Sequence, residues 1–539
     1  MKSYYNKFSK KCMTLVMAII LACTAGCSES KQNINPLDGY KYEQELNVID
    51  DNNRTYYEVF VYSYYDSDED GIGDINGVTQ KLDYIQELGF NGIWLMPIMP
   101  SPTYHKYDTT DYCDIDSEYG TIDDFRNFLE ECHKRNIHVI IDFMMNHTSS
   151  KHKWFEEACT YLKGLGKEEI SVEKCPYIDY YHFEKEEDAG TNYYQVGNSE
   201  WYYEGSFWDQ MPDLDLYSEA VRGELEQAAK FWLDLGVDGF RIDGVKYFDT
   251  SDEKNIEILG WFNDYVKSIK KDAYIVSEVW SDYPIASEYL KSGVNSTFDF
   301  TMGQGSGIIA SSVFKSGSNA GKTLAEAIVN VQEVTKKANP DSTVAEFLTN
   351  HDTGRCANFL VKPEKVKMAY ALEILMTGNV FVYYGEEIGL SGSGKDENLR
   401  APMYWSNTDN TGMTNGPADM DKEEYMFPSL AEQQDNATSI YNFIKRCIRI
   451  RNENPEIARG EVAIIEEVKD ESICALTKTY EDSKLVLLYN VSKESKTVTI
   501  SKDTYGYEQI RGYVSTDGTE VILEGDTVTL PPYSAVVLK

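Results

Sequence analysis

Gly239-Phe-Arg-Ile-Asp-Gly-Val-Lys246 places a cation and a carboxylate at the end of a short apolar run. The run from Leu235 to Ile242 predicts a buried strand that is entered from a turn. Arg241 and Asp243 are two positions apart, so both side chains point to the same side of that strand. A guanidinium beside a carboxylate keeps the carboxylate ionised at neutral pH, as a nucleophile requires. An isolated Arg–Asp pair at a strand end is more often structural than catalytic. The residues at the other strand ends must therefore decide whether this pair is catalytic.

Seven more apolar runs of strand length lie along the chain, and segments with helical spacing separate most of them. They occupy residues 57–63, 89–97, 137–143, 273–277, 296–300, 344–348 and 379–384. Short apolar strands that alternate with helices pair in parallel. Eight such units predict an α/β fold, a closed (β/α)8 TIM barrel, whose active site lies at the C-terminal ends of the strands.

Two segments depart from this alternation. Residues 148–212 separate the third strand from its helix and are aromatic and polar, which predicts a small inserted domain. From about Gly460 onward strands alternate without helices, which predicts a C-terminal antiparallel β-sandwich. The predicted domains are the barrel at 51–147 and 213–455, the inserted domain at 148–212 and the sandwich at 456–539.

The N-terminus has the pattern of a processing segment. Four lysines precede an apolar run, Met13 to Ala22, that is too short to span a bilayer comfortably. Small residues before Cys27 resemble a bacterial lipobox, which predicts a signal peptide at 1–26, lipidation of Cys27 and a polar tether at 27–50. An ordinary secretory peptide with an incidental cysteine is the alternative.

Charge and cysteine content narrow the function classes. The formal net charge of −38 argues against nucleic acid or an anionic membrane surface as a partner. We therefore expect contact with the membrane only through a lipid anchor, while a neutral ligand such as a sugar is compatible. The cysteines after Cys27 are scattered without CxxC spacing, so they indicate neither a zinc site nor a disulfide framework.

Polar residues gather at the ends of four predicted strands. Besides Arg241 and Asp243, these are the end of Asp142-Phe-Met-Met-Asn-His147, Glu278, and Asn350-His-Asp352. Charged groups at strand ends need partners, and the C-terminal ends of parallel strands meet on one face of a barrel. Three carboxylates and two histidines are therefore expected to converge there, which favours a catalytic site over unrelated structural pairs.

These motifs resemble the conserved regions of the alpha-amylase family, glycoside hydrolase family 13. Residues 142–147 (DFMMNH) resemble its first region, 239–246 (GFRIDGVK) its second, 276–279 (VSEV) its third and 349–352 (TNHD) its fourth. The resemblance covers nearly everything after residue 50, and four motifs in this order on these strands are highly specific.

The resemblance implies that Asp243 is the nucleophile, Glu278 the general acid/base and Asp352 the third carboxylate, which grips sugar hydroxyls. Retaining hydrolysis needs one charged and one protonated carboxyl group. Arg241 favours the charged form of Asp243. Glu278 lacks an adjacent cation and has apolar neighbours, so we expect it to stay protonated.

The resemblance also implies the contacts to substrate. His147 and His351 would hydrogen-bond the hydroxyls of the bound glucose, and Tyr107 would stack under the same sugar, although Lys106 stands where the family has Gly. Lys246 would reach the sugar on the leaving side. The implied substrate-binding residues are Tyr107, Asp108, His147, Arg241, Lys246, His351 and Arg400.

An acidic loop after the first strand predicts a metal site. Oxygen ligands alternate along residues 66–74 as in the first part of an EF-hand loop, but Gly77 replaces the glutamate that would complete it. The loop resembles the calcium site of many family members, which implies Ca²⁺ as a cofactor; a solvated acidic turn is the alternative. The implied ligands are Asp66, Asp68, Asp70, the Ile72 carbonyl and Asp74.

Taken together, the N-terminal pattern and the family resemblance predict a lipid-anchored alpha-amylase on the extracellular face of the cell envelope that cuts internal α-1,4 bonds of starch or maltooligosaccharides. Gly244 and Lys246 favour this activity, because α-1,6-specific relatives carry Val after the nucleophile. An exo-acting alpha-glucosidase or an oligo-1,6-glucosidase stays open, because Met211–Leu216 (MPDLDL) lies between the subgroup patterns. A transglycosylase and a catalytically silent sugar-binding lipoprotein are less favoured.

Overall fold

The computed structural model describes residues 49, 51–185, 189–315, 319–422 and 425–539. The predicted signal peptide, Cys27 and almost all of the predicted tether lie outside these residues. None of the helices in the described ranges combines the length and apolar character that a bilayer crossing requires.

Eight parallel strands close into a barrel in the order β1-β11-β10-β9-β8-β7-β3-β2, which confirms the predicted fold class. The ring closes because β1 pairs in parallel with both β11 and β2. The strands are β1 (Thr55–Val59), β2 (Gly92–Leu95), β3 (His138–Phe143), β7 (Gly239–Ile242), β8 (Tyr274–Ser277), β9 (Ser296–Phe298), β10 (Thr343–Phe347) and β11 (Asn379–Tyr383).

The first strand is shorter than the apolar run at 57–63 predicts. It ends at Val59, and Val61–Ser63 form a turn of 3-10 helix instead. Val61 and Ser63 are nevertheless buried. The apolar run therefore continues past the strand end because the chain stays in the core as it leaves the barrel.

Helices surround the barrel, and several begin or end at capping residues. Thr121 and Asp124 form a capping box at the start of α4, while Gly236 ends α6 in the left-handed conformation. The longer helices are α2 (Ile75–Gln80), α3 (Leu82–Leu88), α4 (Ile122–Lys134), α6 (Glu219–Leu235), α7 (Asp252–Ile269), α9 (Ile308–Lys315), α10 (Ala320–Ala338), α12 (Pro363–Ile374) and α15 (Ile440–Glu453). The short ones are α8 (Tyr283–Ala286), α11 (Cys356–Leu360), α13 (Asp396–Leu399), α14 (Leu430–Gln434), α16 (Glu456–Arg459) and α17 (Lys502–Tyr505).

An aromatic-rich cluster of strand residues packs together apart from the main core. Tyr56 stacks on Phe381 with ring centroids 4.6 Å apart, and Trp94 lies 5.5 Å from Phe298. Large side chains of several strands therefore fill the barrel, and its polar groups are found at the strand ends.

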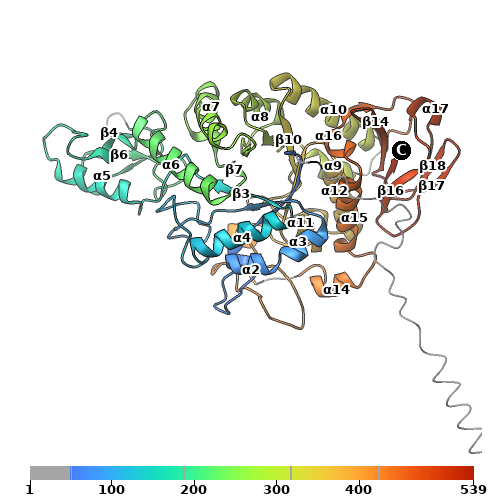
Figure 1. Ribbon diagram of the computed structural model, residues 1–539, viewed down its shortest axis with the longest axis horizontal. Helices are drawn as coiled ribbons and strands as arrows, with labels where there is room; N and C mark the ends of the chain where they lie inside the picture. Colours follow the sequence, from blue (N-terminus) through green and yellow to red (C-terminus); the bar gives the residue numbers. More distant parts are fainter. Residues whose placement is uncertain (1–48, 50, 186–188, 316–318, 423–424) are drawn as a thin grey trace, which may run out of the picture.

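Two smaller units flank the barrel (Figure 1). Between β3 and α6 the chain forms α5 (Lys153–Gly164) and a small antiparallel sheet of β4 (Phe183–Lys185), β5 (Tyr193–Gln195) and β6 (Trp201–Glu204). The C-terminal part forms two antiparallel sheets. The first sheet has the strand order β12 (Glu461–Ile464), β13 (Ile473–Tyr480), β14 (Ser483–Asn490), β19 (Ser534–Leu538) and β16 (Ile510–Ser515). The second sheet has the order β15 (Lys496–Thr499), β18 (Thr527–Leu530) and β17 (Ile522–Glu524).

Candidate active site

Arg241 lies at the centre of the candidate site, fully buried on β7. Its Nη1 donates to Asp142 at 2.6 Å and to Asp243 at 2.5 Å, and its Nη2 forms an ion pair with Glu278 at 3.1 Å. Register explains the first contact, because Asp142 on β3 is paired with Arg241. One guanidinium therefore brings together carboxylates from the ends of three neighbouring strands.

Glu278 corrects one expectation from the sequence. The prediction that it lacks an adjacent cation is wrong, because Arg241 reaches it from the neighbouring strand. Burial nevertheless raises the pKa of Glu278 to about 7, with Arg241 opposing the shift and the charges of Asp243 and Asp352 adding to it. A carboxyl group that titrates near neutrality can donate a proton and later accept one.

His351 is held between carboxylates. Its Nδ1 lies 2.5 Å from Glu58, and its Nε2 lies 3.0 Å from Asp352 and 2.7 Å from the Tyr107 hydroxyl. Burial alone would lower the pKa of His351, but Asp352 and Glu58 together raise it to about 10. The ring is therefore an imidazolium at neutral pH, with both nitrogens carrying protons.

Sequence reasoning missed Glu58. It lies on β1, buried, and its second oxygen has no hydrogen-bond partner among the residues that the structure describes. The available signal was a single carboxylate within the apolar run at 57–63, because a buried charge of that kind needs a partner.

Asp352 and Arg400 form an ion pair beside His351. Arg400 Nη2 lies 3.2 Å from Asp352, and the guanidinium also pairs with Asp396. Burial favours the protonated form of Asp352, but His351 and Arg400 outweigh it and hold the pKa of Asp352 well below its usual range. This third carboxylate is therefore charged wherever Glu278 titrates.

Tyr107 and His147 lie beside this network. The Tyr107 ring stacks on His351 at 5.5 Å, and His147 Nε2 lies 3.2 Å from the Tyr107 carbonyl. His147 Nδ1 is buried without a partner in the described part of the chain. Asp108 is 1% exposed and accepts hydrogen bonds from Ser101 and Ser149, so it supports the loop that carries Tyr107.

Lys106, at the position where the resemblance implies a glycine, adopts a backbone conformation that favours glycine. Its φ is 61°, in the left-handed region that favours glycine. Its buried ammonium pairs with Asp116 at 2.9 Å and Glu118 at 2.7 Å. These two ion pairs offset the burial of the charge, so the departure from the family pattern is accommodated.

Exposed aromatic rings lie close to the catalytic groups. Phe207 of the inserted segment packs 4.7 Å from Tyr247 and 5.1 Å from His147, and Trp280 stacks on Phe300 at 4.8 Å. Phe207, Tyr247 and Trp280 are each at least 40% exposed. Aromatic faces of this kind suit the apolar faces of sugar rings. Lys246 precedes Tyr247, is partly exposed, and makes no ion pair within the described residues.

The acidic loop brings together some of its predicted ligands. Carboxylate oxygens of Asp66, Asp68 and Asp74 lie within 4.8 Å of one another. Asp70 is not part of this group, and its side chain instead accepts from the backbone N–H of Ile72 at 2.7 Å. The donor set is all oxygen, as calcium prefers.

Comparison with known proteins identifies matching families and relatives. The family described as "Alpha amylase, catalytic domain" matches residues 58–460, and "Alpha-amylase SusG C-terminal domain" matches residues 473–537. Alpha-amylase 3 of Dictyoglomus thermophilum is 36% identical over 503 residues, which cover 90% of this chain and 93% of that protein. An oligo-1,6-glucosidase of Parageobacillus thermoglucosidasius is 27% identical, with 90% and 97% covered. The solved structure of Eubacterium rectale Amy13B is similar with a TM-score of 0.88 at 45% identity, covering 92% of this chain and 96% of that one.

Proposed function

The chain belongs to the alpha-amylase family, glycoside hydrolase family 13, and we propose that it is a retaining alpha-amylase that cleaves internal α-1,4 bonds of starch and maltooligosaccharides. The observation that carries this proposal is the contact of one buried guanidinium, that of Arg241, with both Asp243 and Glu278. It holds the two catalytic carboxyl groups of a retaining glycosidase on the same side of the barrel.

The geometry supports a double displacement. Asp243, as carboxylate, attacks the anomeric carbon while Glu278 gives its proton to the departing glycosidic oxygen, so the C–O bond breaks as a glycosyl ester forms. Glu278, now a carboxylate, then takes a proton from water, which attacks the same carbon and releases Asp243. The pKa of Glu278 near 7 suits both roles. Charged Asp352 and His351 would hold sugar hydroxyls during both steps.

Gly244 supports the α-1,4 preference. Its φ is 51°, and a Cβ at this position would lie 2.9 Å from the Phe207 ring. A valine here, as in α-1,6-specific relatives, would meet both a strained backbone and that ring. The exposed rings of Tyr247 and Trp280 and the side chain of Lys246 support endo action, because they suit a glucan that continues beyond the cleaved bond.

The products of a starch digest test this proposal. We expect viscosity to fall early, before much glucose appears, and isomaltose to be nearly inert. Glucose as the sole early product would instead favour an exo-acting alpha-glucosidase. Faster cleavage of isomaltose than of maltotriose would favour an oligo-1,6-glucosidase, the activity for which the Parageobacillus relative is named. Transfer products in place of free maltooligosaccharides would indicate a transglycosylase.

Calcium binding is the second part of the proposal. Asp66, Asp68 and Asp74 fit the ion, because three carboxylates converge in one loop and each is an oxygen donor. When bound, the ion would link the start and the end of this loop next to α2. Its contribution would be to the stability of the folded state.

We also propose that the enzyme is exported and held on the extracellular face of the cell envelope by a lipid on Cys27. The support is the sequence alone, a positive segment and an apolar run followed by small residues and Cys27. Mass spectrometry of the mature N-terminus tests it. A lipidated Cys27 is expected, and an unmodified chain that begins elsewhere would contradict the proposal.

A further inference from the structure

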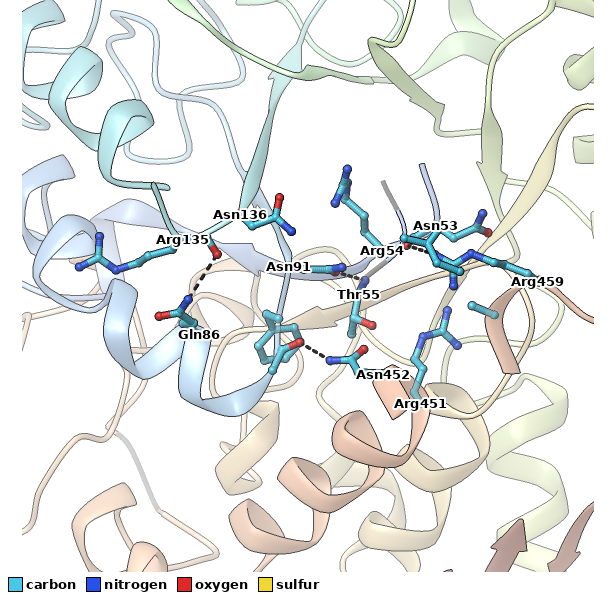
Figure 2. Close-up of a pocket in the computed structure, with 14 residues that line it drawn as sticks. Asn53, Arg54, Thr55, Gln86, Asn91, Arg135, Asn136, Arg451, Asn452 and Arg459 are labelled. Atoms are coloured by element: carbon cyan, nitrogen blue, oxygen red, sulfur yellow. Dashed lines mark hydrogen bonds between the residues drawn. The ribbon is translucent and has the colours of Figure 1, made fainter. Parts of the chain in front are cut away.

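A pocket, drawn in Figure 2, is lined by residues that directly precede β1, β2 and β3. It therefore lies at the N-terminal end of the barrel, away from the strand ends that carry Asp243 and Glu278. Its cavity volume is about 210 Å³. Its walls come from the segments that lead into β1, β2 and β3 and from α15 and α16. The polar lining residues are Asn53, Arg54, Thr55, Gln86, Asn91, Arg135, Asn136, Arg451, Asn452 and Arg459.

The lining has an unusual charge for this chain. It contains four guanidinium and five amide side chains, and none of the described lining residues carries a carboxylate. Two of the guanidinium groups are paired with carboxylates just outside the lining, Arg135 with Asp83 and Glu131, and Arg459 with Asp51. The whole chain, by contrast, has 89 acidic residues against 51 basic ones. A concave surface that concentrates one sign of charge raises the local concentration of the opposite ion.

Arg451 is the buried cation of this pocket. It is 3% exposed, and it donates to the backbone carbonyls of Ile374 at 3.0 Å, Met376 at 2.6 Å and Gly378. None of these partners is a carboxylate. Burial, and then the neighbouring charge of Arg459, lower the pKa of Arg451 to about 9. A buried charge with only neutral partners is costly, so a bound anion would be stabilising here.

Two further groups offer donors that the described residues leave unbonded. Arg459 uses Nε and Nη2 to bind Asp51 at 2.6 and 2.8 Å, and its Nη1 makes no bond. The Asn91 Oδ1 accepts from the Thr55 backbone N–H at 2.8 Å, so the amide NH2 is directed the other way and has no partner. Figure 2 shows the Arg451 and Arg459 guanidinium groups near each other beside Thr55.

We propose that this pocket binds a small oxyanion of the phosphate class. Guanidinium and amide N–H groups are the donors that such an anion prefers, and guanidinium groups bind it bidentately. A dissolved ion fits better than an anionic lipid surface, because the formal charge of −38 repels an extended surface of the same sign. A bound ion would join the segments before β1 and β2 to α15 and α16, so its effect is on stability.

Asn91→Asp is the most specific test variant. It keeps the shape of the side chain and the acceptor for the Thr55 N–H, but it replaces the NH2 donor with a negative oxygen. Asn198→Asp is the matched control, because it makes the same charge change at an exposed position outside the pocket. Arg459→Gln is a second variant that removes a guanidinium, in case Asn91→Asp does not fold.

Calorimetric titration with inorganic phosphate, in a phosphate-free buffer of constant ionic strength, is the measurement. We expect one site on the wild type and on Asn198→Asp, at least tenfold weaker binding to Asn91→Asp and Arg459→Gln, and a higher melting temperature with phosphate than with chloride. Absence of phosphate binding to the wild type would overturn the proposal. Equal binding by the wild type and the folded pocket variants would also overturn it.

Discussion

Two buried cations organise the carboxylates of the active site. Arg241 contacts Asp243 and Glu278, while His351 lies between Glu58 and Asp352. These cations allow several carboxylates to be buried close together, which would otherwise force most of them to take up protons. Two of these carboxyl groups nevertheless have raised pKa values, about 7 for Glu278 and about 6 for Asp142, because burial raises each more than Arg241 lowers it.

Glu58→Gln tests the charge state of His351. The His351 pKa is raised to about 10, so the ring stays protonated below that pH in the wild type. Loss of the Glu58 charge lowers that pKa, so the imidazolium is lost at a lower pH than before. We expect at least a tenfold lower kcat/KM above pH 7, from loss of a charge-assisted hydrogen bond of about 2 kcal/mol. The pH profile of kcat/KM measures it.

Glu387→Gln is the control for this variant. Glu387 is also a fully buried carboxylate, but it accepts from Tyr57 and Tyr84, each at 2.6 Å, and does not contact His351. It is expected to lower the melting temperature and leave the pH profile in place. If both variants changed the profile alike, Glu58 would have no specific action on His351.

The loop after β7 packs against the inserted segment at residues 148–212. Gly244 directly follows Asp243, the proposed nucleophile, in the left-handed conformation, and packs against Phe207. The loop therefore has little room for a side chain at this position. The proposed α-1,4 preference and the placement of Asp243 would consequently depend on the same residue.

Gly244→Val should reduce cleavage of maltotriose by at least tenfold without introducing activity on isomaltose. The added side chain strains the backbone and displaces Phe207, which shifts the neighbouring Asp243. Kinetics on both substrates and a melting curve measure these effects. Gly223→Ala in α6 is the control, because a Cβ there meets nothing within 4 Å and alanine is the better helix former. A fully active Gly244→Val would contradict the role of this loop.

Asp68→Asn tests whether the acidic loop at residues 66–74 binds calcium or is only a solvated acidic turn. Calcium should raise the melting temperature of the wild type, and chelator should lower it. Asp68→Asn removes one of the three converging carboxylates and should diminish this response. Asp70→Asn, outside that group, should retain it. Equal melting curves with and without chelator, on wild type shown to be metal-free beforehand, would leave only an acidic turn.

The sequence patterns predicted where the strands lie more accurately than they predicted the contacts between side chains on different strands. Each predicted barrel strand coincides with or overlaps an observed one, because apolar runs and turns are local signals. The contact of Arg241 with Glu278 was not predictable in this way, because it crosses from β7 to the end of β8. Likewise Asp68 and Asp70 have the same spacing pattern, and only the path of the loop separates them.

At the level of the whole molecule, a buried lysine links the C-terminal domain to the barrel. Lys478 on β13 donates to the carbonyls of Leu375 at 2.9 Å and Ile457 at 2.8 Å, and to the Thr377 hydroxyl at 3.1 Å. Burial, with the charge of Arg451, lowers the pKa of Lys478 well below its usual value. The bonds to Leu375 and Thr377 span the interface, so the two domains are expected to unfold together.

Lys478→Ala should destabilise the protein by about 2–4 kcal/mol. It leaves a cavity and removes the donor from two buried carbonyl groups. Thermal unfolding should then show a lower melting temperature or a separate transition for the C-terminal domain. Lys484→Ala on the adjacent strand is the control, because that side chain is exposed and its loss should change little. Identical melting curves for both variants would contradict this account of the interface.

Asp243 and Glu278, held by Arg241, are proposed to carry out the hydrolysis. The initial rate of maltooligosaccharide cleavage by Asp243→Asn and Glu278→Gln tests it most directly, on variants with wild-type melting behaviour. Each is expected to lose orders of magnitude in turnover, because nucleophile and general acid each make large contributions. A folded variant of either kind that retained more than about a tenth of the wild-type rate would contradict the claim.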